Sequence, residues 1–351
     1  MSQHIGRLNP FVCGGAAPAF PAFHARAPWW GGDLQTLRNV LQFTSLHLSV
    51  AQSRLRLPLA DGDELIALLN MPAADTGKPA IVLIHGLTGD ENSRNICTSA
   101  AYHLARGFPV IRLNLRGAGP SLGRHRGHYH AGRSDDLRQA LPHLPETLRM
   151  RGVLLVGVSL GGNMLLKFLA EGALPMVRAA AAVSAPIDLK RAQTSIMRPR
   201  NTIYHRHLLH TMKSDAMRAG QVAADIVAGI ANIYDFDDRI VAPSNGFASA
   251  EDYYARSSAA PLLGGIRTPT LVVHAADDPW IPTEMYTERD WPSAGPVTLL
   301  TAPGGGHVGF HARDDRWPWH DRCIGRFFNA CMASTAQDNP IFDLRAPQDP
   351  G

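Results

Sequence analysis

A serine between two glycines, at the end of an apolar run, is the first feature of the sequence that could carry out a reaction. Residues 157–161 (GVSLG) follow the apolar run 153–156 and open a segment of helical character. A serine in a sharp strand-to-helix turn presents its hydroxyl, and flanking glycines let neighbouring backbone approach closely. The free N–H groups at a helix N-terminus favour an oxyanion. The pattern therefore predicts Ser159 as the nucleophile of an acyl transfer.

A serine hydroxyl is a weak nucleophile until a histidine takes its proton, and a carboxylate must orient that histidine. In this architecture the chain order is serine, acid, histidine. Asp277 and Asp278 follow the apolar run 271–274. We predict Asp278 as the acid, because it directly precedes Pro279 and a strand-end turn of this kind directs that residue to the base. Asp277 is the alternative.

The predicted base is His307. It lies in the glycine-rich segment 304–309, which follows one further apolar run, residues 297–300. This is the place in the chain where an acid–base histidine is expected to follow the acid.

An oxyanion hole requires two N–H donors, one after the nucleophile and one from the loop that follows an early strand. Leu160 supplies the first. The segment 85–89 (HGLTG) comes directly after the apolar run 80–84, and we predict the N–H of Leu87 as the second. We interpret His85 as a residue that shapes this loop.

The elements that must position these residues alternate between strands and helices. Runs that are apolar on both faces suit a parallel sheet covered by helices. They span residues 80–84, 110–115, 153–158, 179–183 and 271–274, with helical segments at 92–106, 134–150 (opened by a Ser134 cap) and 160–171. Strands at 46–50, 54–57 and 64–69 precede them and predict an antiparallel start. The fold class is therefore α/β, a mostly parallel, doubly wound sheet with helices on both faces.

The chain divides into an arm, one large domain and a tail. Residues 1–45 predict an N-terminal arm, anchored by the aromatics of Pro28-Trp29-Trp30. Residues 46–332 form the α/β domain, and 333–351 a polar tail. Residues 185–261 are polar and helical between consecutive strands, which predicts a cap over the carboxyl edge of the sheet. Its apolar residues are interpreted as ordinary packing: Ile196, Met197, Leu208, Leu209, Met212 and Met217.

Composition excludes several classes of protein. The 351 residues are 45% hydrophobic and 18% charged, unlike a disordered chain or a coiled coil. No transmembrane run or secretion signal is evident, so a cytoplasmic location is expected. The net charge of +4 is too diffuse to predict a nucleic-acid partner. The basic loop 124–130 is interpreted as solvated, with an anionic substrate or lipid head group as the alternative.

No cofactor is predicted. The four cysteines lack C-x-x-C spacing and are expected as free thiols. The histidine pairs His128/His130 and His205/His207 lack a third ligand, so no metal site is predicted. Neither a phosphate-binding loop nor a dinucleotide fingerprint is present. The sequence indicates neither a membrane partner nor an oligomeric state.

Taken in order, these motifs resemble the α/β-hydrolase superfamily and, within it, the YheT-like hydrolases. The likeness spans about residues 28–328. It rests on 28–37 (PWWGGDLQTL), 85–89, 114–117 (NLRG), 157–163, 184–189 (SAPIDL), 252–254 (DYY), 277–279 and 305–310 (GGHVGF). The resemblance implies an α/β-hydrolase fold with Ser159, Asp278 and His307 as the triad. It also implies hydrolysis of carboxylic esters, short- to medium-chain esters or acylglycerols. Residues 116–120 (RGAGP) depart from the family's usual arginine-glycine-cysteine-glycine-glycine, in a loop expected to border the pocket.

The expected partner is thus a small ester or lipid substrate. Two other functions fit the same residues. An acyltransferase would use the same triad with an alcohol or amine in place of water, and a non-catalytic protein would only bind hydrophobic ligands under the cap.

Overall fold

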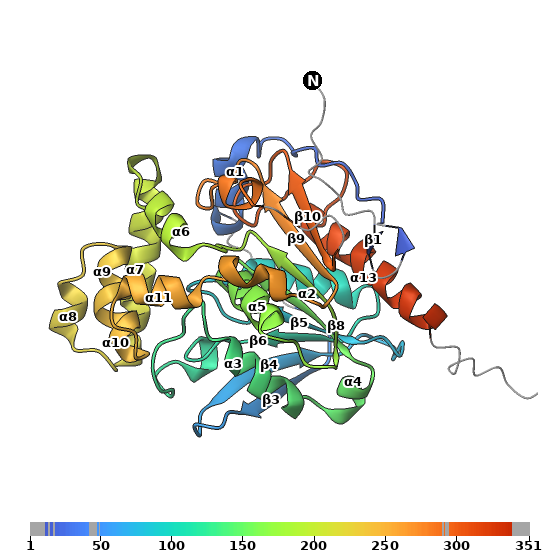
Figure 1. Ribbon diagram of the computed structural model, residues 1–351, viewed down its shortest axis with the longest axis horizontal. Helices are drawn as coiled ribbons and strands as arrows, with labels where there is room; N and C mark the ends of the chain where they lie inside the picture. The colour runs from blue at the N-terminus through green and yellow to red at the C-terminus, as the bar shows by residue number, and fades with distance from the viewer. Residues whose placement is uncertain are drawn as a thin grey trace, which may run out of the picture.

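An eight-stranded, mostly parallel sheet lies at the centre of the protein (Figure 1). The computed structural model describes residues 11–12, 15–16, 18–41, 48, 50–289, 291 and 295–338. The strand order is β10-β9-β8-β7-β5-β6-β4-β3. These strands are β3 (Gln52–Pro58), β4 (Glu64–Asn70), β5 (Ala80–Ile84), β6 (Val110–Leu113), β7 (Val153–Val158), β8 (Val177–Val183), β9 (Thr270–Ala275) and β10 (Val297–Ala302). Only the pairs β3–β4 and β4–β6 are antiparallel, which confirms the predicted antiparallel start.

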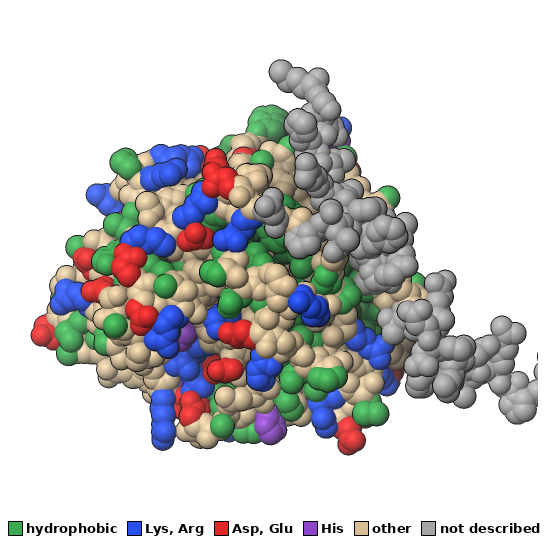
Figure 2. Space-filling model, viewed as in Figure 1, with side chains coloured by type: hydrophobic (Ala, Val, Ile, Leu, Met, Phe, Trp, Pro, Cys, Tyr) green, Lys and Arg blue, Asp and Glu red, His purple; other side chains and the backbone are tan. Residues whose placement is uncertain are grey.

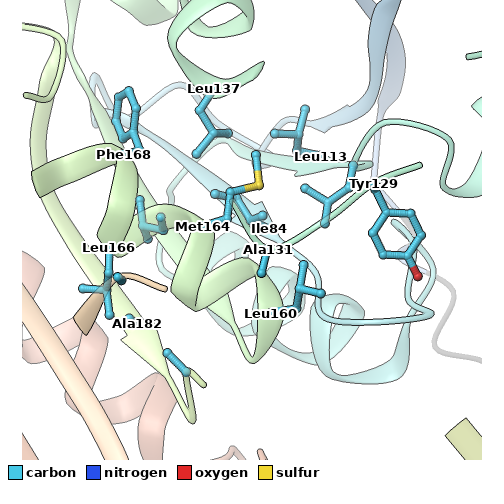
Figure 3. Packing of buried hydrophobic residues seen from close by; sticks show 14 of the residues in the cluster. Ile84, Leu113, Tyr129, Ala131, Leu137, Leu160, Met164, Leu166, Phe168 and Ala182 are labelled. Atoms are coloured by element: carbon cyan, nitrogen blue, oxygen red, sulfur yellow. The ribbon is translucent and has the colours of Figure 1, made fainter. Parts of the chain in front are cut away.

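Helices cover both faces of the sheet because the strands are apolar on both faces. In β5, Ile81 and Leu83 belong to one buried cluster and Val82 and Ile84 to the other. The helices α2 (Arg94–Leu104) and α13 (Trp319–Asp338) pack on the side of Ile81 and Leu83. The helices α3 (Ser134–Ala140) and α5 (Leu160–Ala170) pack on the second side, that of Val82 and Ile84. Figure 3 shows Met164 of α5 between Leu137 and Ile84 on this second side.

A helical cap separates β8 from β9. It projects to one side of the sheet (yellow-green to orange in Figure 1). The cap comprises α6 (Leu189–Ile196), η3 (Pro199–Asn201), α7 (Thr202–Ala219), α8 (Ala224–Ala228), α9 (Ile233–Phe236), the π-helix η4 (Asp237–Val241), α10 (Ala242–Ser244), α11 (Ala250–Ser257) and η5 (Ala260–Gly265). Of the apolar cap residues singled out in the sequence, Ile196, Leu208, Leu209 and Met212 are buried, whereas Met197 and Met217 are exposed.

The predicted helix 134–150 is broken into three pieces. After α3 the chain forms η2 (Leu141–His143) and then α4 (Glu146–Met150). Pro142 and Pro145 lack the N–H that a continuous helix needs, so the single-helix prediction is wrong. The predicted Ser134 cap is also wrong: Arg133 occupies the N-cap position, and the Ser134 hydroxyl donates to Glu171 instead (2.5 Å).

The N-terminal arm contains a helix, α1 (Gly31–Leu41), and a two-stranded sheet of β1 (Phe11–Val12) and β2 (Gly15–Ala16). The predicted aromatic anchor is wrong for Trp30, whose side chain is 63% exposed. Phe23 fixes the arm instead, with its ring edge-on to Phe310 and Trp319. Of the expected strand 46–50, residues 46, 47 and 49 lie outside the described residues. Leu48 and Val50 are not in a strand.

The structure tests what the sequence predicts for the cysteines. Cys97 and Cys323 are free thiols, but Cys331 is disulfide-bonded, so the expectation of free cysteines is wrong there. Within the described ranges, every helix is too short or too polar to cross a bilayer.

On the face shown in Figure 2, Lys and Arg side chains are interspersed with Asp and Glu. The small positive net charge is therefore not gathered into one patch on this face.

Candidate active site

Ser159 occupies the sharp turn between β7 and α5. Its backbone has φ 51° and ψ −122°, a strained conformation for a residue with a side chain. The turn packs tightly against the loop after β5, since a Cβ at Gly161 would lie 2.3 Å from the carbonyl oxygen of His85. Only glycine allows this approach. The Ser159 side chain lines a cavity whose wall includes residues of the cap.

Sheet register brings the three predicted side chains to one edge. β9 pairs in parallel with both β8 and β10, so the loops after β9 and β10 leave the sheet next to each other. The His307 ring bridges the other two groups: Nδ1 lies 2.9 Å from Asp278 Oδ2, and Nε2 lies 2.9 Å from Ser159 Oγ. Trp280 stacks on the imidazole, with ring centroids 4.3 Å apart. The hydroxyl, the imidazole and the carboxylate thus form one continuous hydrogen-bonded chain.

Asp278 is buried and fully engaged. Besides its contact with His307, its Oδ1 accepts hydrogen bonds from the backbone N–H groups of Trp280 (2.9 Å) and Ile281 (3.0 Å). Burial alone would raise the pKa of Asp278, but the charge and hydrogen bond of His307 outweigh it, and the net pKa is lowered. The carboxylate is therefore ionised beside the imidazole at neutral pH.

Asp277, the alternative acid, points elsewhere. Its Oδ1 accepts a 2.8 Å hydrogen bond from the N–H of Gly306, and burial raises its pKa. Gly306 has φ 58°, and a Cβ there would lie 2.3 Å from the carbonyl oxygen of Gly32. Asp277 thus holds the backbone of the histidine loop, while Asp278 contacts the imidazole.

The two predicted oxyanion donors, Leu87 and Leu160, both line the same cavity as Ser159. Among the described residues, the hydrogen bonds of loops and turns use neither of these two N–H groups. His85 shapes the loop, as interpreted from the sequence: its Nε2 accepts from the N–H of Leu115 (3.0 Å) and its Nδ1 contacts Gly86 O (2.8 Å). Burial lowers the pKa of His85, which keeps the ring neutral.

A cavity of about 120 Å³ opens between Ser159 and the cap. Its wall is mainly apolar, and a few polar groups interrupt it. The lining residues are Leu87, Ser159, Leu160, Pro186, Leu189, Ala192, Gln193, Ile196, Leu208, Met212, Ile233, Asp237, Tyr253, Tyr254, Trp280 and Ile281. Residues 116–120 are not among the described lining residues, so the expectation that this loop borders the pocket is wrong. Arg116 turns away from the cavity to a buried ion pair with Asp136 (2.7 Å).

Sequence reasoning missed the contribution of α1. The Thr36 hydroxyl oxygen accepts from the N–H of His307 (2.8 Å), and Gln35 Oε1 accepts from the N–H of His311 (2.7 Å). Both side chains are buried. The segment 28–37 was noted as part of the resemblance, but nothing in it predicted contact with residues almost three hundred positions later.

The basic loop 124–130 and the histidine pairs are not among the described residues that line this cavity. In the basic loop, Arg124 and Arg126 are exposed, but His125, Tyr129 and His130 are buried, so the loop is only partly solvated. Within the described part of the chain, no three His, Cys, Asp or Glu side chains form a group that could hold a metal ion.

Comparisons with known proteins identify the family to which the chain belongs. The sequence model of the Alpha/beta hydrolase family matches residues 81–317. The YheT protein of Escherichia coli (strain K12) is 35% identical over 265 residues, which cover 73% of this chain and 77% of that protein. Monoacylglycerol lipase of Saccharomyces cerevisiae (strain ATCC 204508 / S288c) is 27% identical over 271 residues, covering 72% of this chain and 60% of that protein.

The fold also recurs among solved structures. The Pyrococcus furiosus esterase Pf2001 superposes with a TM-score of 0.54 at 14% identity, covering 89% of this chain and 98% of that chain. The chain belongs to the alpha/beta hydrolase family. Within that family it is a YheT-like member.

Proposed function

We propose that this protein hydrolyses carboxylic esters through an acyl-enzyme formed on Ser159. The observation that carries the proposal is the His307 ring, which lies 2.9 Å from both the Ser159 hydroxyl and the Asp278 carboxylate. This is the arrangement in which an imidazole can take a serine proton while a carboxylate stabilises the resulting charge. Relatives named esterase and lipase support the assignment as a carboxylic ester hydrolase.

The reaction proceeds in two halves. Ser159 Oγ attacks the ester carbonyl carbon while His307 Nε2 accepts its proton. The N–H groups of Leu87 and Leu160 bind the oxyanion of the tetrahedral intermediate. The imidazolium, paired with Asp278, then protonates the departing alcohol. Water then attacks the acyl carbon while His307 takes one of its protons, and the imidazolium returns this proton to Ser159 Oγ as the bond between Oγ and the acyl carbon breaks and the acid leaves.

The cavity indicates the substrate class. An apolar wall next to the nucleophile favours an aliphatic chain, because burying each methylene group contributes about 0.8 kcal/mol. A volume of about 120 Å³ suits a short to medium chain better than a long one. Short- to medium-chain esters or acylglycerols are therefore the proposed substrates.

Labelling with a fluorophosphonate probe tests the nucleophile directly. We expect the wild-type protein to be labelled and Ser159→Ala to remain unlabelled, with a loss in kcat of roughly 10⁶-fold for ester hydrolysis. Near-normal turnover by Ser159→Ala would overturn the mechanism. An unlabelled wild-type protein that still binds esters would point to a non-catalytic binder. Ester products formed only in the presence of an alcohol acceptor would instead indicate an acyltransferase.

A further inference from the structure

Asp237 is a buried carboxyl group in the wall of the Ser159 cavity. It is 8% exposed and is the only carboxyl group among the described residues that line this cavity. One oxygen, Oδ2, accepts a 2.6 Å hydrogen bond from the Tyr254 hydroxyl. Across the described part of the chain, neither a hydrogen-bond donor to Oδ1 nor a cationic partner for the carboxylate is found. Because Asp237 lines the cavity and Tyr254 already engages Oδ2, Oδ1 has the greater free capacity to pair with a ligand.

Burying a carboxyl group such as that of Asp237 lowers the stability of the folded protein unless another group pairs with it. Transfer of a polar group from water to an apolar site without a hydrogen bond is unfavourable, and buried polar atoms in proteins are normally satisfied. Burial raises the pKa of Asp237 to about 7, although the Tyr254 hydrogen bond opposes this. An apolar residue would close this end of the cavity at lower cost, so the half-satisfied carboxyl indicates a binding role.

The backbone at Asp237 is irregular as well. The residue begins the π-helix η4 (Asp237–Val241), which follows the α-helical turn α9. π-Helical turns are rare and occur often at functional sites, because the extra residue redirects side chains from the ordinary helical positions. Asp237 lies in the cavity wall at the start of this turn. The next residue, Asp238, uses its carboxylate to accept from the N–H of Ala250 at the start of α11 (2.8 Å).

We propose that Asp237 is a specificity residue that binds a hydroxyl group on the substrate chain that fills the cavity. The apolar wall holds the aliphatic part of the ester, Ser159 faces the carbonyl, and Asp237 Oδ1 pairs with a hydroxyl further along the chain. This inference rests on the proposed ester hydrolysis at Ser159 and adds a substrate feature to it.

A hydroxyl group suits this carboxyl better than an ammonium group. Near neutral pH Asp237 exchanges between its neutral and ionised forms, since its pKa is raised to about 7. A hydroxyl both donates and accepts and carries no charge, so it pairs with either form, whereas a buried ammonium has its charge compensated only by the carboxylate.

Two matched pairs of esters test the proposal. Ethyl hexanoate and ethyl 6-hydroxyhexanoate differ by a hydroxyl on the acyl chain. Butyl butyrate and 4-hydroxybutyl butyrate differ by a hydroxyl on the alcohol part of the ester. The readout is the ratio of kcat/KM for the hydroxylated ester to that for the plain ester. We expect a ratio of about 10 to 100 in at least one pair for the wild-type protein. Asp237→Leu should bring it close to one, whereas Asp237→Asn, which keeps an acceptor oxygen, should retain part of the preference.

Asp238→Asn is the matched control, because it alters a neighbouring carboxylate of the same π-helix that bonds Ala250 rather than lining the cavity. It should leave the ratio unchanged. Fluorophosphonate labelling of Ser159 verifies that each variant is folded.

A ratio at or below one for both wild-type pairs, or a preference that survives in Asp237→Leu, would overturn the proposal. Hydrolysis of the plain esters with no hydroxyl preference contradicts this inference alone. Failure of the wild-type protein to hydrolyse any of the four esters, without labelling of Ser159, contradicts the proposed function as well.

Discussion

The hydroxyl oxygen of Thr36 accepts a 2.8 Å hydrogen bond from the backbone N–H of His307, 271 positions later in the chain. The same hydroxyl donates to the carbonyl oxygen of Gly32 (2.7 Å). Thr36 is 5% exposed, so water cannot readily replace either bond. A helix in the N-terminal arm therefore fixes the backbone of the proposed catalytic base.

Removing this hydroxyl should affect both stability and turnover. Thr36→Val leaves the His307 N–H unpaired in a buried setting, whereas the Gly32 carbonyl keeps its place in the hydrogen bonding of α1. We expect the free energy of unfolding to fall by about 1–3 kcal/mol. Turnover, kcat, should fall about tenfold, because His307 loses part of its orientation. Denaturant unfolding and ester hydrolysis measure the two effects. Thr36→Ser keeps the hydroxyl and should stay close to wild type in kcat; an equal loss in both variants would argue against the hydrogen bond.

The adjacent aspartates should respond very differently to amide substitution. Asp278→Asn removes the negative charge beside His307 and favours the wrong tautomer of its ring, so kcat should fall by about 10⁴-fold. Asp277→Asn keeps an oxygen that can accept from the Gly306 N–H, and we expect a loss of about tenfold or less. Steady-state kinetics on one ester compare the two variants. A larger loss in Asp277→Asn would mean that the acid is misassigned.

The raised pKa of Asp237 predicts a pH-dependent contribution to stability. Its pKa is about 7 in the folded protein and near 3.8 when exposed to water. A carboxyl whose pKa is raised by folding stabilises the folded state fully below its unfolded value and loses that contribution as pH rises through the folded value. Relative to Asp237→Asn, the wild-type protein should therefore lose up to about 4 kcal/mol of unfolding free energy between pH 4 and pH 8.

Denaturant unfolding of both proteins across this range gives the difference directly. Comparing the two removes the contributions of the buried histidines, which are common to both. Asp238→Asn provides the control. The Asp238 side chain is only partly buried, so this substitution should not reproduce the pH-dependent difference in stability. If the difference in unfolding free energy between the wild-type protein and Asp237→Asn stays constant with pH, Asp237 titrates normally.

The cavity wall predicts chain-length selectivity. Met212 on α7 is buried and lines the cavity, whereas Met217 on the same helix is 49% exposed. Met212→Trp should fill part of the cavity and lower kcat/KM for hexanoate esters by about 10- to 100-fold, with a smaller effect on acetate esters. Met217→Trp should leave the chain-length profile unchanged. A series of esters of increasing acyl length measures the effect, and a uniform loss across the series would show that the chain binds elsewhere.

Local sequence patterns were sufficient for much of the fold and for the candidate triad. The apolar runs predicted the parallel strands because a strand buried on both faces must be apolar throughout. Residues 157–161 predicted the turn at Ser159 because glycine spacing and the adjoining strand and helix are properties of neighbouring residues. The break in the helix 134–150 was also within reach of the sequence, since Pro142 and Pro145 interrupt it.

Contacts between distant segments were decided only by the tertiary structure. The sequence favoured Asp278 as the acid, but it did not show what Asp277 does, because the direction of each side chain in a turn is set by what packs around it. The bond between Thr36 and His307 and the position of Asp237 in the cavity depend on how α1 and the cap dock on the sheet. Such docking is a sum of many weak packing contacts between residues far apart in the chain, and no short motif records it.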